Sequence, residues 1–257
     1  MKNILITGGA GFIGYHLANY HMNNGDDVII IDNLSKDKQI IDPEFNTLIL
    51  KDNIKFIEFD LRDATIPIDL PSKLDTVYHL AAINGTDLFY EIPYELCRNN
   101  LLLTIGLLDI LKTKKVKKLV YASTSEAYAG AEKYNLVPIP TDENVPVVFP
   151  QPTDKRFSYA TSKFMGEFLS ISFGELLSIP VNVIRFHNIY GPRMGYRHVI
   201  PQFIERAISS KDSFLIYGMN NTRAFCFIDD AINAMTSIAK MENTKNEIIH
   251  VGNQDEE

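Results

Sequence analysis

Two side chains with acid–base chemistry lie one helical turn apart in the second half of the chain. Tyr159 and Lys163 fall on the same face of a helix that the sequence predicts at 158–177. A free tyrosine has a pKa of about 10 and is a poor base at neutral pH, but a neighbouring ammonium group favours its phenolate. The pair therefore predicts a site that removes the proton of a hydroxyl group, although this spacing also arises by chance in helices.

A second group of polar side chains follows the predicted strand at 119–122. Four hydrogen-bonding residues stand at this strand end, more than packing explains: Ser123, Thr124, Ser125 and Glu126. We expect Thr124 to hydrogen-bond the hydroxyl group that Tyr159 deprotonates. The carboxylate of Glu126 is a further candidate acid or base beside it.

A glycine-rich turn near the start of the chain indicates a bound dinucleotide. The apolar run at 3–7 leads directly into Gly9, Gly11 and Gly14, which have the spacing of a dinucleotide-binding turn. Free backbone N–H groups and the positive end of the following helix suit a pyrophosphate. Asp32 ends the next strand, where it would accept from the adenosine ribose and repel the extra phosphate of NADP. The sequence therefore predicts NAD, although Asp32 and Asn33 also serve to turn the chain.

Strand-like and helical segments alternate through the first two thirds of the chain. The predicted helices are at 12–24, 95–112 and 158–177, and the predicted strands are at 3–7, 28–31, 54–59, 77–80, 119–122 and 181–186. Continuous apolar strands separated by helices indicate a Rossmann-type α/β fold, a doubly wound parallel sheet with ligands beyond the carboxyl ends of its strands. Two stretches interrupt the pattern: 33–53, with one expected helix, and the proline-rich 134–157, which we expect to be a functional loop.

The composition is that of an ordinary globular protein with an acidic balance. The net charge of −7 and the pI of about 5.4 argue against a nucleic-acid partner, so an anionic ligand must be held by backbone amides and a few arginines. Cys97 and Cys226 match no metal-binding spacing, and we expect no metal. No stretch approaches the roughly 20 apolar residues of a membrane span and no signal peptide is visible, so we expect no membrane partner and a cytoplasmic location.

Five motifs occur in the order and at the distances of a known family. They are Thr7-Gly8-Gly9-Ala10-Gly11-Phe12-Ile13-Gly14, His79-Leu80-Ala81-Ala82, Ser123-Thr124-Ser125-Glu126, Tyr159-x-x-x-Lys163 and Gly191-Pro192-Arg193. Together, over essentially the whole chain, they resemble the extended short-chain dehydrogenase/reductases, within them the NAD-dependent nucleotide-sugar epimerase/dehydratase family. The resemblance implies that Thr124, Tyr159 and Lys163 are catalytic. It also implies that NAD contacts Gly8, Gly11, Phe12, Ile13, Gly14, Asp32, Asn33, Asp60, Leu61, Leu80, Ala81, Ala82, Tyr159 and Lys163.

The segments after the strand at 181–186 resemble those that bind the substrate in this family. Asn188 and Arg223 resemble residues that meet the substrate diphosphate, and a guanidinium group matches phosphate oxygens. Arg193 is a further candidate, unless it only fixes its own loop. With Thr124 and Ser125, these residues are expected to bind a nucleotide-diphosphate sugar.

The resemblance also implies a division of the chain and a partner. We expect an NAD-binding domain at 1–180, whose sheet is completed near 181–186 and 247–251, and substrate-binding segments at 187–246. Family members usually continue beyond the last predicted strand, so the C-terminal substrate lobe is expected to be small or shortened here. Relatives are commonly homodimers, and the helical stretches 101–111 and 164–177 could form such a contact or could pack on the sheet.

The implied reaction begins with oxidation of the sugar 4-position, giving a 4-keto intermediate and NADH. Glu126 favours dehydration or decarboxylation as the next step, because elimination needs an added base and a simple epimerase does not. A 4-epimerase and a 4-dehydrogenase that releases the keto sugar stay open as alternatives. A non-enzymatic member that binds NAD as a scaffold or redox sensor is the alternative from another functional class.

Overall fold

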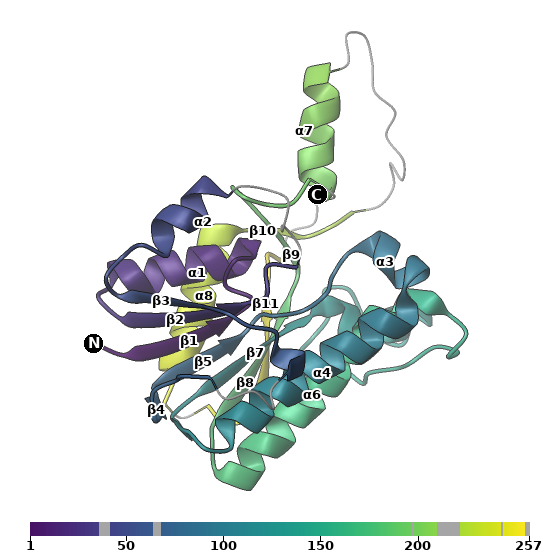
Figure 1. The fold of residues 1–257 in the computed structure, drawn as a ribbon. Helices are drawn as coiled ribbons and strands as arrows, with labels where there is room; N and C mark the ends of the chain where they lie inside the picture. Colours follow the sequence, from purple (N-terminus) through teal and green to yellow (C-terminus); the bar gives the residue numbers. More distant parts are fainter. Residues whose placement is uncertain (36–41, 64–67, 197, 210–221, 243, 255–257) are drawn as a thin grey trace.

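A parallel sheet runs through the centre of the molecule (Figure 1). The computed structural model describes residues 1–35, 42–63, 68–196, 198–209, 222–242 and 244–254. Within them the central sheet has seven strands in the order β11-β8-β7-β5-β1-β2-β3. Their bounds are β1 Asn3–Thr7, β2 Asp27–Asp32, β3 Ile54–Glu58, β5 Thr76–His79, β7 Leu119–Thr124, β8 Val181–Phe186 and β11 Glu247–Val251.

The strand order reverses direction between β1 and β5, as it does in doubly wound folds. After β1, the strands β2 and β3 extend the sheet on one side of β1. The later strands β5, β7, β8 and β11 extend it on the other side. This reversal opens a crevice at the carboxyl ends of β1 and β5, where ligands of such sheets bind. The predicted fold class is confirmed. Each predicted strand begins and ends within two residues of the bounds of an observed strand.

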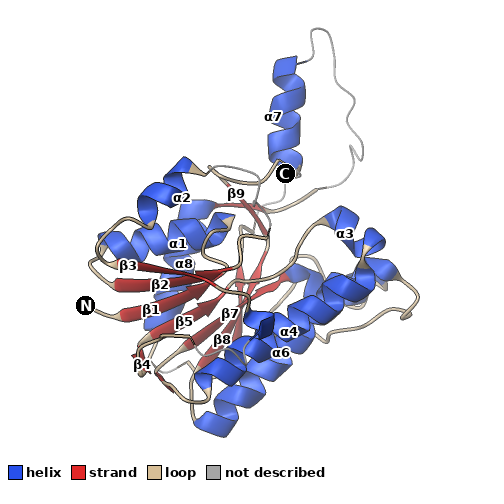
Figure 2. Ribbon diagram, viewed as in Figure 1, coloured by secondary structure: helices blue, strands red, loops and turns tan. Residues whose placement is uncertain are grey.

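Helices cover both faces of the sheet (Figure 2). On one face α1 (Phe12–Asn23), α2 (Pro43–Leu48) and α8 (Ile228–Lys240) contribute to the same hydrophobic core as Ile4 and Ile6 of β1. On the other face α4 (Pro93–Leu111) and α6 (Ser158–Leu177) pack against Leu5. Successive side chains of a strand point to opposite faces, so one apolar run supplies both cores.

Shorter elements surround the carboxyl ends of the strands. They are the 3₁₀ helices η1 (Leu61–Asp63), η2 (Ser125–Tyr128) and η3 (Lys155–Phe157), the helices α3 (Thr86–Glu91), α5 (Ala129–Lys133) and α7 (Val199–Ser209), and the two-strand sheet of β9 (Asn188–Tyr190) and β10 (Phe225–Phe227). The small β4 (Lys73–Leu74) and β6 (Lys115–Val116) pair at the opposite end. α7 stands away from the sheet in Figure 1. No residue of α7 is buried.

The two irregular stretches have the expected character. α2 is the one helix described between residues 33 and 53, and residues 36–41 of that stretch lie outside the described residues. The proline-rich stretch from Tyr134 contains no regular element until η3. The expected substrate segment 187–246 includes α8, which packs beside α1 on the sheet, so part of it belongs to the core of the sheet domain. Among the described helices, none combines the length and the apolar character that a bilayer crossing needs.

Candidate active site

The glycine turn joins β1 to α1 with no space for side chains. Gly8 has a φ of +73°, and a Cβ there would lie 2.7 Å from the backbone nitrogen of Ala81. A Cβ on Gly14 would lie 2.3 Å from the carbonyl oxygen of Gly8. Gly11 is the N-cap of α1 and offers no side chain to the amides of the first turn, which also holds no acidic residue. These amides are therefore available to an anion, and the turn fits the pyrophosphate of NAD.

The ends of β2 and β3 supply the carboxylates expected beside the adenosine. Asp32 accepts hydrogen bonds from the backbone nitrogens of Ala10 (3.1 Å) and Leu34 (2.9 Å), which ties it to the glycine turn. Asp60 accepts from Asn33 at 2.8 Å. Hydrogen bonds from Arg62 hold the pKa of Asp60 far below its usual range, so Asp60 is an ionised acceptor. Residues at the carboxyl ends of neighbouring strands thus fit an adenine nucleotide.

Thr124 and Glu126 lie at the end of β7. The hydroxyl oxygen of Thr124 accepts from the backbone nitrogen of Glu126 at 3.3 Å and caps η2. The carboxylate of Glu126 binds the guanidinium of Arg156, with an Nη2–Oε1 distance of 2.7 Å. Arg156 also lies over the ring of Phe89, 5.5 Å from its centroid. The sequence offered no signal for Arg156, because its loop brings it to Glu126 from 30 residues away.

Tyr159 and Lys163 occupy the first two turns of α6 and are both buried. The ring of Tyr159 stacks on Phe89, with centroids 5.3 Å apart and planes 9° apart. Burial raises the pKa of Tyr159, and the charge of Glu126 raises it further. Burial lowers the pKa of Lys163 to about 7, against the opposing charge of Glu167. The expected phenolate depends on Lys163 together with the positive ring of NAD, and in the chain alone burial holds the Tyr159 pKa above its ordinary value.

A buried chain of hydrogen bonds connects the glycine turn to α6. The hydroxyl of Thr7 lies 2.7 Å from Nδ1 of His79, and Nε2 of His79 lies 3.2 Å from the hydroxyl of Thr104. Thr104 donates to the carbonyl of Asn100, whose amide nitrogen donates to Ser162 next to Lys163. Since the hydroxyl of Thr104 donates to a carbonyl, it accepts from Nε2–H, and Nδ1 accepts from Thr7. Burial lowers the pKa of His79 to about 3, which keeps this ring neutral.

An ion pair lies beneath the same site. Glu167 accepts from the hydroxyl of Ser123 at 2.5 Å and from Nε of Arg185 at 3.0 Å. The Glu167 and Arg185 side chains are both 2% exposed. A buried pair of this kind is expensive to desolvate, so its hydrogen bonds serve mainly to fix geometry. Here they join β7, β8 and α6 beside Thr124. Arg185 stands inside the apolar run of β8, which is a sequence signal that could have indicated a buried partner.

Of the three substrate residues expected after β8, Asn188 and Arg223 lie close together, because β9 pairs with β10, and Arg193 binds elsewhere. The amide nitrogen of Asn188 in β9 donates to the carbonyl of Ala224 at 3.1 Å. Arg223 is exposed and donates to the carbonyl of Thr222 at 2.7 Å. Arg193 instead binds Asp42, away from Thr124 and Tyr159, so the structure does not bring it together with the catalytic candidates.

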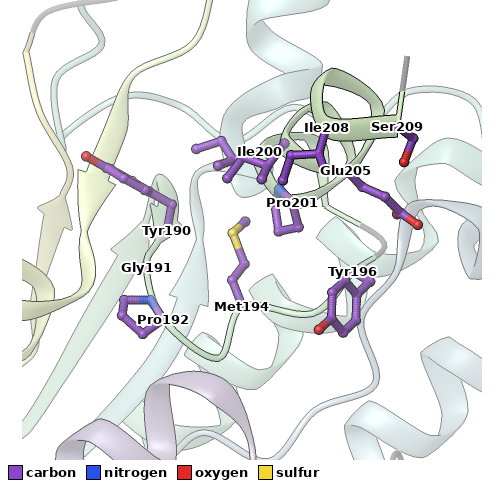
Figure 3. Close-up of a pocket in the computed structure, with 11 residues that line it drawn as sticks. Tyr190, Gly191, Pro192, Met194, Tyr196, Ile200, Pro201, Glu205, Ile208 and Ser209 are labelled. Carbon is purple, nitrogen blue, oxygen red and sulfur yellow. The ribbon is translucent and has the colours of Figure 1, made fainter. Parts of the chain in front are cut away.

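An apolar cavity of about 620 Å³ lies between α7 and the loop that follows β9 (Figure 3). Its walls carry Tyr190, Met194 and Tyr196 from β9 and the loop, and Ile200 and Ile208 from α7. Cavities of this size and apolar character are typical of small-molecule sites.

Known proteins match the chain over nearly its whole length. Residues 4–252 match the NAD dependent epimerase/dehydratase family. A UDP-N-acetyl-alpha-D-glucosaminuronate decarboxylase from Bacillus cytotoxicus is 38% identical over 260 residues, which cover 99% of this chain and 76% of that protein. A dTDP-D-glucose 4,6-dehydratase from Dictyostelium discoideum is 33% identical over 253 residues, which cover 93% of this chain and 56% of that protein.

A solved structure agrees in fold and in cofactor. The UDP-glucuronic acid 4-epimerase from Bacillus cereus, in complex with NAD, matches with a TM-score of 0.78 and 26% identity, over 99% of this chain and 78% of that one. The chain belongs to the NAD dependent epimerase/dehydratase family.

Proposed function

We propose that the chain oxidises the 4-position of a nucleotide-diphosphate sugar with NAD and then eliminates carbon dioxide or water from the 4-keto intermediate. One observation carries the proposal. Thr124, Tyr159 and Lys163 lie at the carboxyl ends of the strands, where the glycine turn after β1 also lies. The similarity to a sugar-nucleotide decarboxylase and to a dehydratase supports the same chemistry.

The first step assigns a role to each buried polar group. Tyr159 would take the proton of the sugar hydroxyl, while Thr124 hydrogen-bonds the same oxygen. Lys163 would stabilise the phenolate form of Tyr159 that accepts this proton. When bound, NAD supplies the hydride acceptor and a positive charge. Burial raises the pKa of Tyr159 in the chain alone, so its phenolate would form only with this added positive charge beside Lys163.

The second step would use Glu126. In dehydration a base takes the proton from carbon 5 as the 6-hydroxyl leaves. In decarboxylation the bond from carbon 5 to the carboxylate breaks, its electrons pass to the 4-keto oxygen, and carbon 5 is then protonated. Glu126 could serve either step, and its ion pair with Arg156 would hold the carboxylate in position. A simple 4-epimerase has no use for this pair.

We assign the diphosphate to the segments after β8, with Asn188 and Arg223 as the first candidates. The exposed position of Arg223 leaves its guanidinium accessible to a ligand. A 4-epimerase is the second candidate function, favoured by the match to the UDP-glucuronic acid 4-epimerase. The two free cysteines are consistent with a cytoplasmic location, which belongs to the same proposal.

A panel of nucleotide sugars tests the function. The protein with NAD is incubated with UDP-N-acetylglucosaminuronate, UDP-glucuronate and dTDP-glucose, while NADH absorbance and product masses are followed. We expect a product lighter by carbon dioxide or by water, and an unchanged mass with an altered sugar would indicate the epimerase. No NADH and no product with any of these sugars would refute the proposal.

Tyr159→Phe tests the assigned base. It should lower turnover at least about a hundredfold, because general-base catalysis contributes that much or more. Tyr20→Phe, at the far end of α1, is the matched control and should retain activity. Retained turnover in Tyr159→Phe would remove the phenol from this role.

We further propose that two copies of the chain pair through α4 and α6. These helices lie side by side on the outside of the molecule in Figure 1. They expose several apolar side chains: Ile105, Met165, Phe168, Leu176 and Leu177. An apolar surface of this kind, away from the sheet, favours a contact with a second copy.

A further inference from the structure

Arg193 binds the sheet domain through the N–H edge and one face of its guanidinium group. Its Nη1 lies 2.8 Å from Oδ1 of Asp42 and 2.8 Å from Oε2 of Glu44, and its Nη2 also binds Asp42. The plane of the group lies over the ring of Tyr15, 3.8 Å from the centroid. The side chain is 15% exposed. These contacts combine a bidentate ion pair with a stacked cation, a combination that a lysine could not reproduce.

The contacts end on the first turns of α1, directly behind the glycine turn. Tyr15 follows Gly14, and the next residue, His16, binds the carbonyl of Pro192 through Nε2 at 3.0 Å. Asp42 is the N-cap of α2, the helix that follows the end of β2. The loop that holds Arg193 is thus fixed to the helix whose free amides face the proposed pyrophosphate site.

The other side of this loop forms a wall of the apolar cavity. Gly191, Pro192 and Met194 line it, opposite α7 (Figure 3). No residue of α7 is fully buried, so this loop, fixed through Arg193 and His16, is the firmly held wall of the cavity. Arg193 has a φ of +69°, a conformation that an arginine rarely adopts and that the contacts of its side chain hold in place.

We infer that Arg193 is a positioning residue that couples NAD binding to nucleotide binding at the α7 cavity. This inference rests on the proposed function, because it takes the glycine turn as the NAD site and the cavity as part of the substrate site. A pyrophosphate bound at the first turn of α1 would restrain Tyr15 and His16. Their contacts with Arg193 and Pro192 would then restrain the Gly191–Arg193 loop, which forms a wall of the cavity. Each ligand therefore lowers the cost of ordering the site of the other.

Calorimetric titration of the full chain measures this coupling. The Kd of UDP, with dTDP in parallel, is determined without NAD and with saturating NAD. In the wild type we expect NAD to tighten nucleotide binding by about tenfold, and by reciprocity nucleotide must tighten NAD binding by the same factor. In Arg193→Gln, the ratio of the nucleotide Kd without NAD to that with NAD should fall close to one. Tyr15→Leu, which removes the ring under the guanidinium, should behave in the same way if Arg193→Gln folds poorly.

Lys240→Gln is the matched control. Lys240 of α8 also lies over a tyrosine of α1, with its Nζ 5.8 Å from the ring centroid of Tyr20, but at the far end of that helix. This variant should keep the wild-type factor. Independent binding of the two ligands in the wild type, or a wild-type factor in both Arg193→Gln and Tyr15→Leu, would overturn the inference and leave the proposed function standing. Failure of the wild type to bind NAD at all would instead refute both.

Discussion

Lys163 is expected to make the folded protein less stable than an apolar residue would. Lys163 is 3% exposed, and its Nζ lies over the ring of Tyr121, 4.4 Å from the centroid. Glu167, one turn further along α6, is the opposite charge that supports it. Even so, burial lowers the pKa of Lys163 from its ordinary value of 10.5 to about 7. Lys163→Met removes this buried charge while keeping an unbranched side chain of similar length.

The pKa change gives the size of the effect. Because the folded-state pKa lies below the unfolded value, the unfolded chain binds more protons between pH 7 and 10.5, so stability rises with pH through that window. At about 1.4 kcal/mol for each pKa unit, the charge costs about 4 kcal/mol at pH 7 and about 2 kcal/mol at pH 9. Lys163→Met should therefore unfold with a free energy about 4 kcal/mol larger than that of the wild type at pH 7, and about 2 kcal/mol larger at pH 9.

Urea denaturation of the nucleotide-free protein at both pH values measures these differences. The chain has no tryptophan, so circular dichroism is the probe. A difference of zero at pH 7, or one that does not shrink at pH 9, would refute the claim that this ammonium group is held against its own desolvation. Loss of activity in the stabilised variant would show that this lysine is kept for function at the expense of stability.

Lys118→Met is the control, since Lys118 is also buried but differently bonded. Its Nζ donates to Oδ1 of Asn182 at 2.7 Å, to the carbonyl of Met241 at 3.0 Å and to the carbonyl of Thr244 at 3.1 Å. Removing it leaves buried acceptors unpaired, so this variant should lose about 3 kcal/mol. The two buried lysines are thus expected to respond with opposite signs.

Two further variants test the glycine turn and the outer helices. Gly14→Ala places a methyl group 2.3 Å from the carbonyl oxygen of Gly8, so NAD affinity measured by calorimetry should fall at least about tenfold. Gly25→Ala, whose methyl group meets no atom within 4 Å, should keep wild-type NAD affinity, and equal affinities in both variants would contradict the assigned site. Phe168→Glu should convert a dimer to a monomer in sedimentation velocity, because it places a charge in the apolar face of α6. Leu50→Glu, at an exposed position outside these helices, should leave the dimer intact, and a monomeric wild type would contradict the pairing.

Much of the sheet could be predicted because its strands are buried on both faces. Such strands need continuous apolar runs, and β8 was predicted with its observed bounds for this reason. The bounds of α6 were also predicted, and Ser178, with a φ of 57°, ends that helix shortly before Pro180. β9 and β10 escaped detection because three residues cannot establish a period. α8 was not predicted, although its apolar residues fall on one face of the helix.

The residues of the candidate site could be predicted from the sequence, but the residues that they contact could not. The polar run after β7 and the glycine turn are local patterns, and local patterns are visible in a sequence. The partner of Arg193 is Asp42, 151 residues away, and only the folded chain brings the two together. Burial is equally invisible in a sequence, and it raises the pKa of Tyr159 in the chain alone.

Polar contacts, more than apolar packing, set the position of α6 along the sheet. The hydroxyl of Tyr121 bonds the carbonyl of Lys163 at 3.3 Å, and a Cβ on Gly166 would lie 1.9 Å from that hydroxyl oxygen. Glu167 binds β7 through Ser123 and β8 through its ion pair. Leucine-like contacts tolerate a slip of one helical turn, but a slip of about 5.4 Å would break all of these bonds at once and leave buried charges unpaired. The cost of that error is therefore large, and the same bonds that prevent it hold the phenol and the ammonium group at the end of β7.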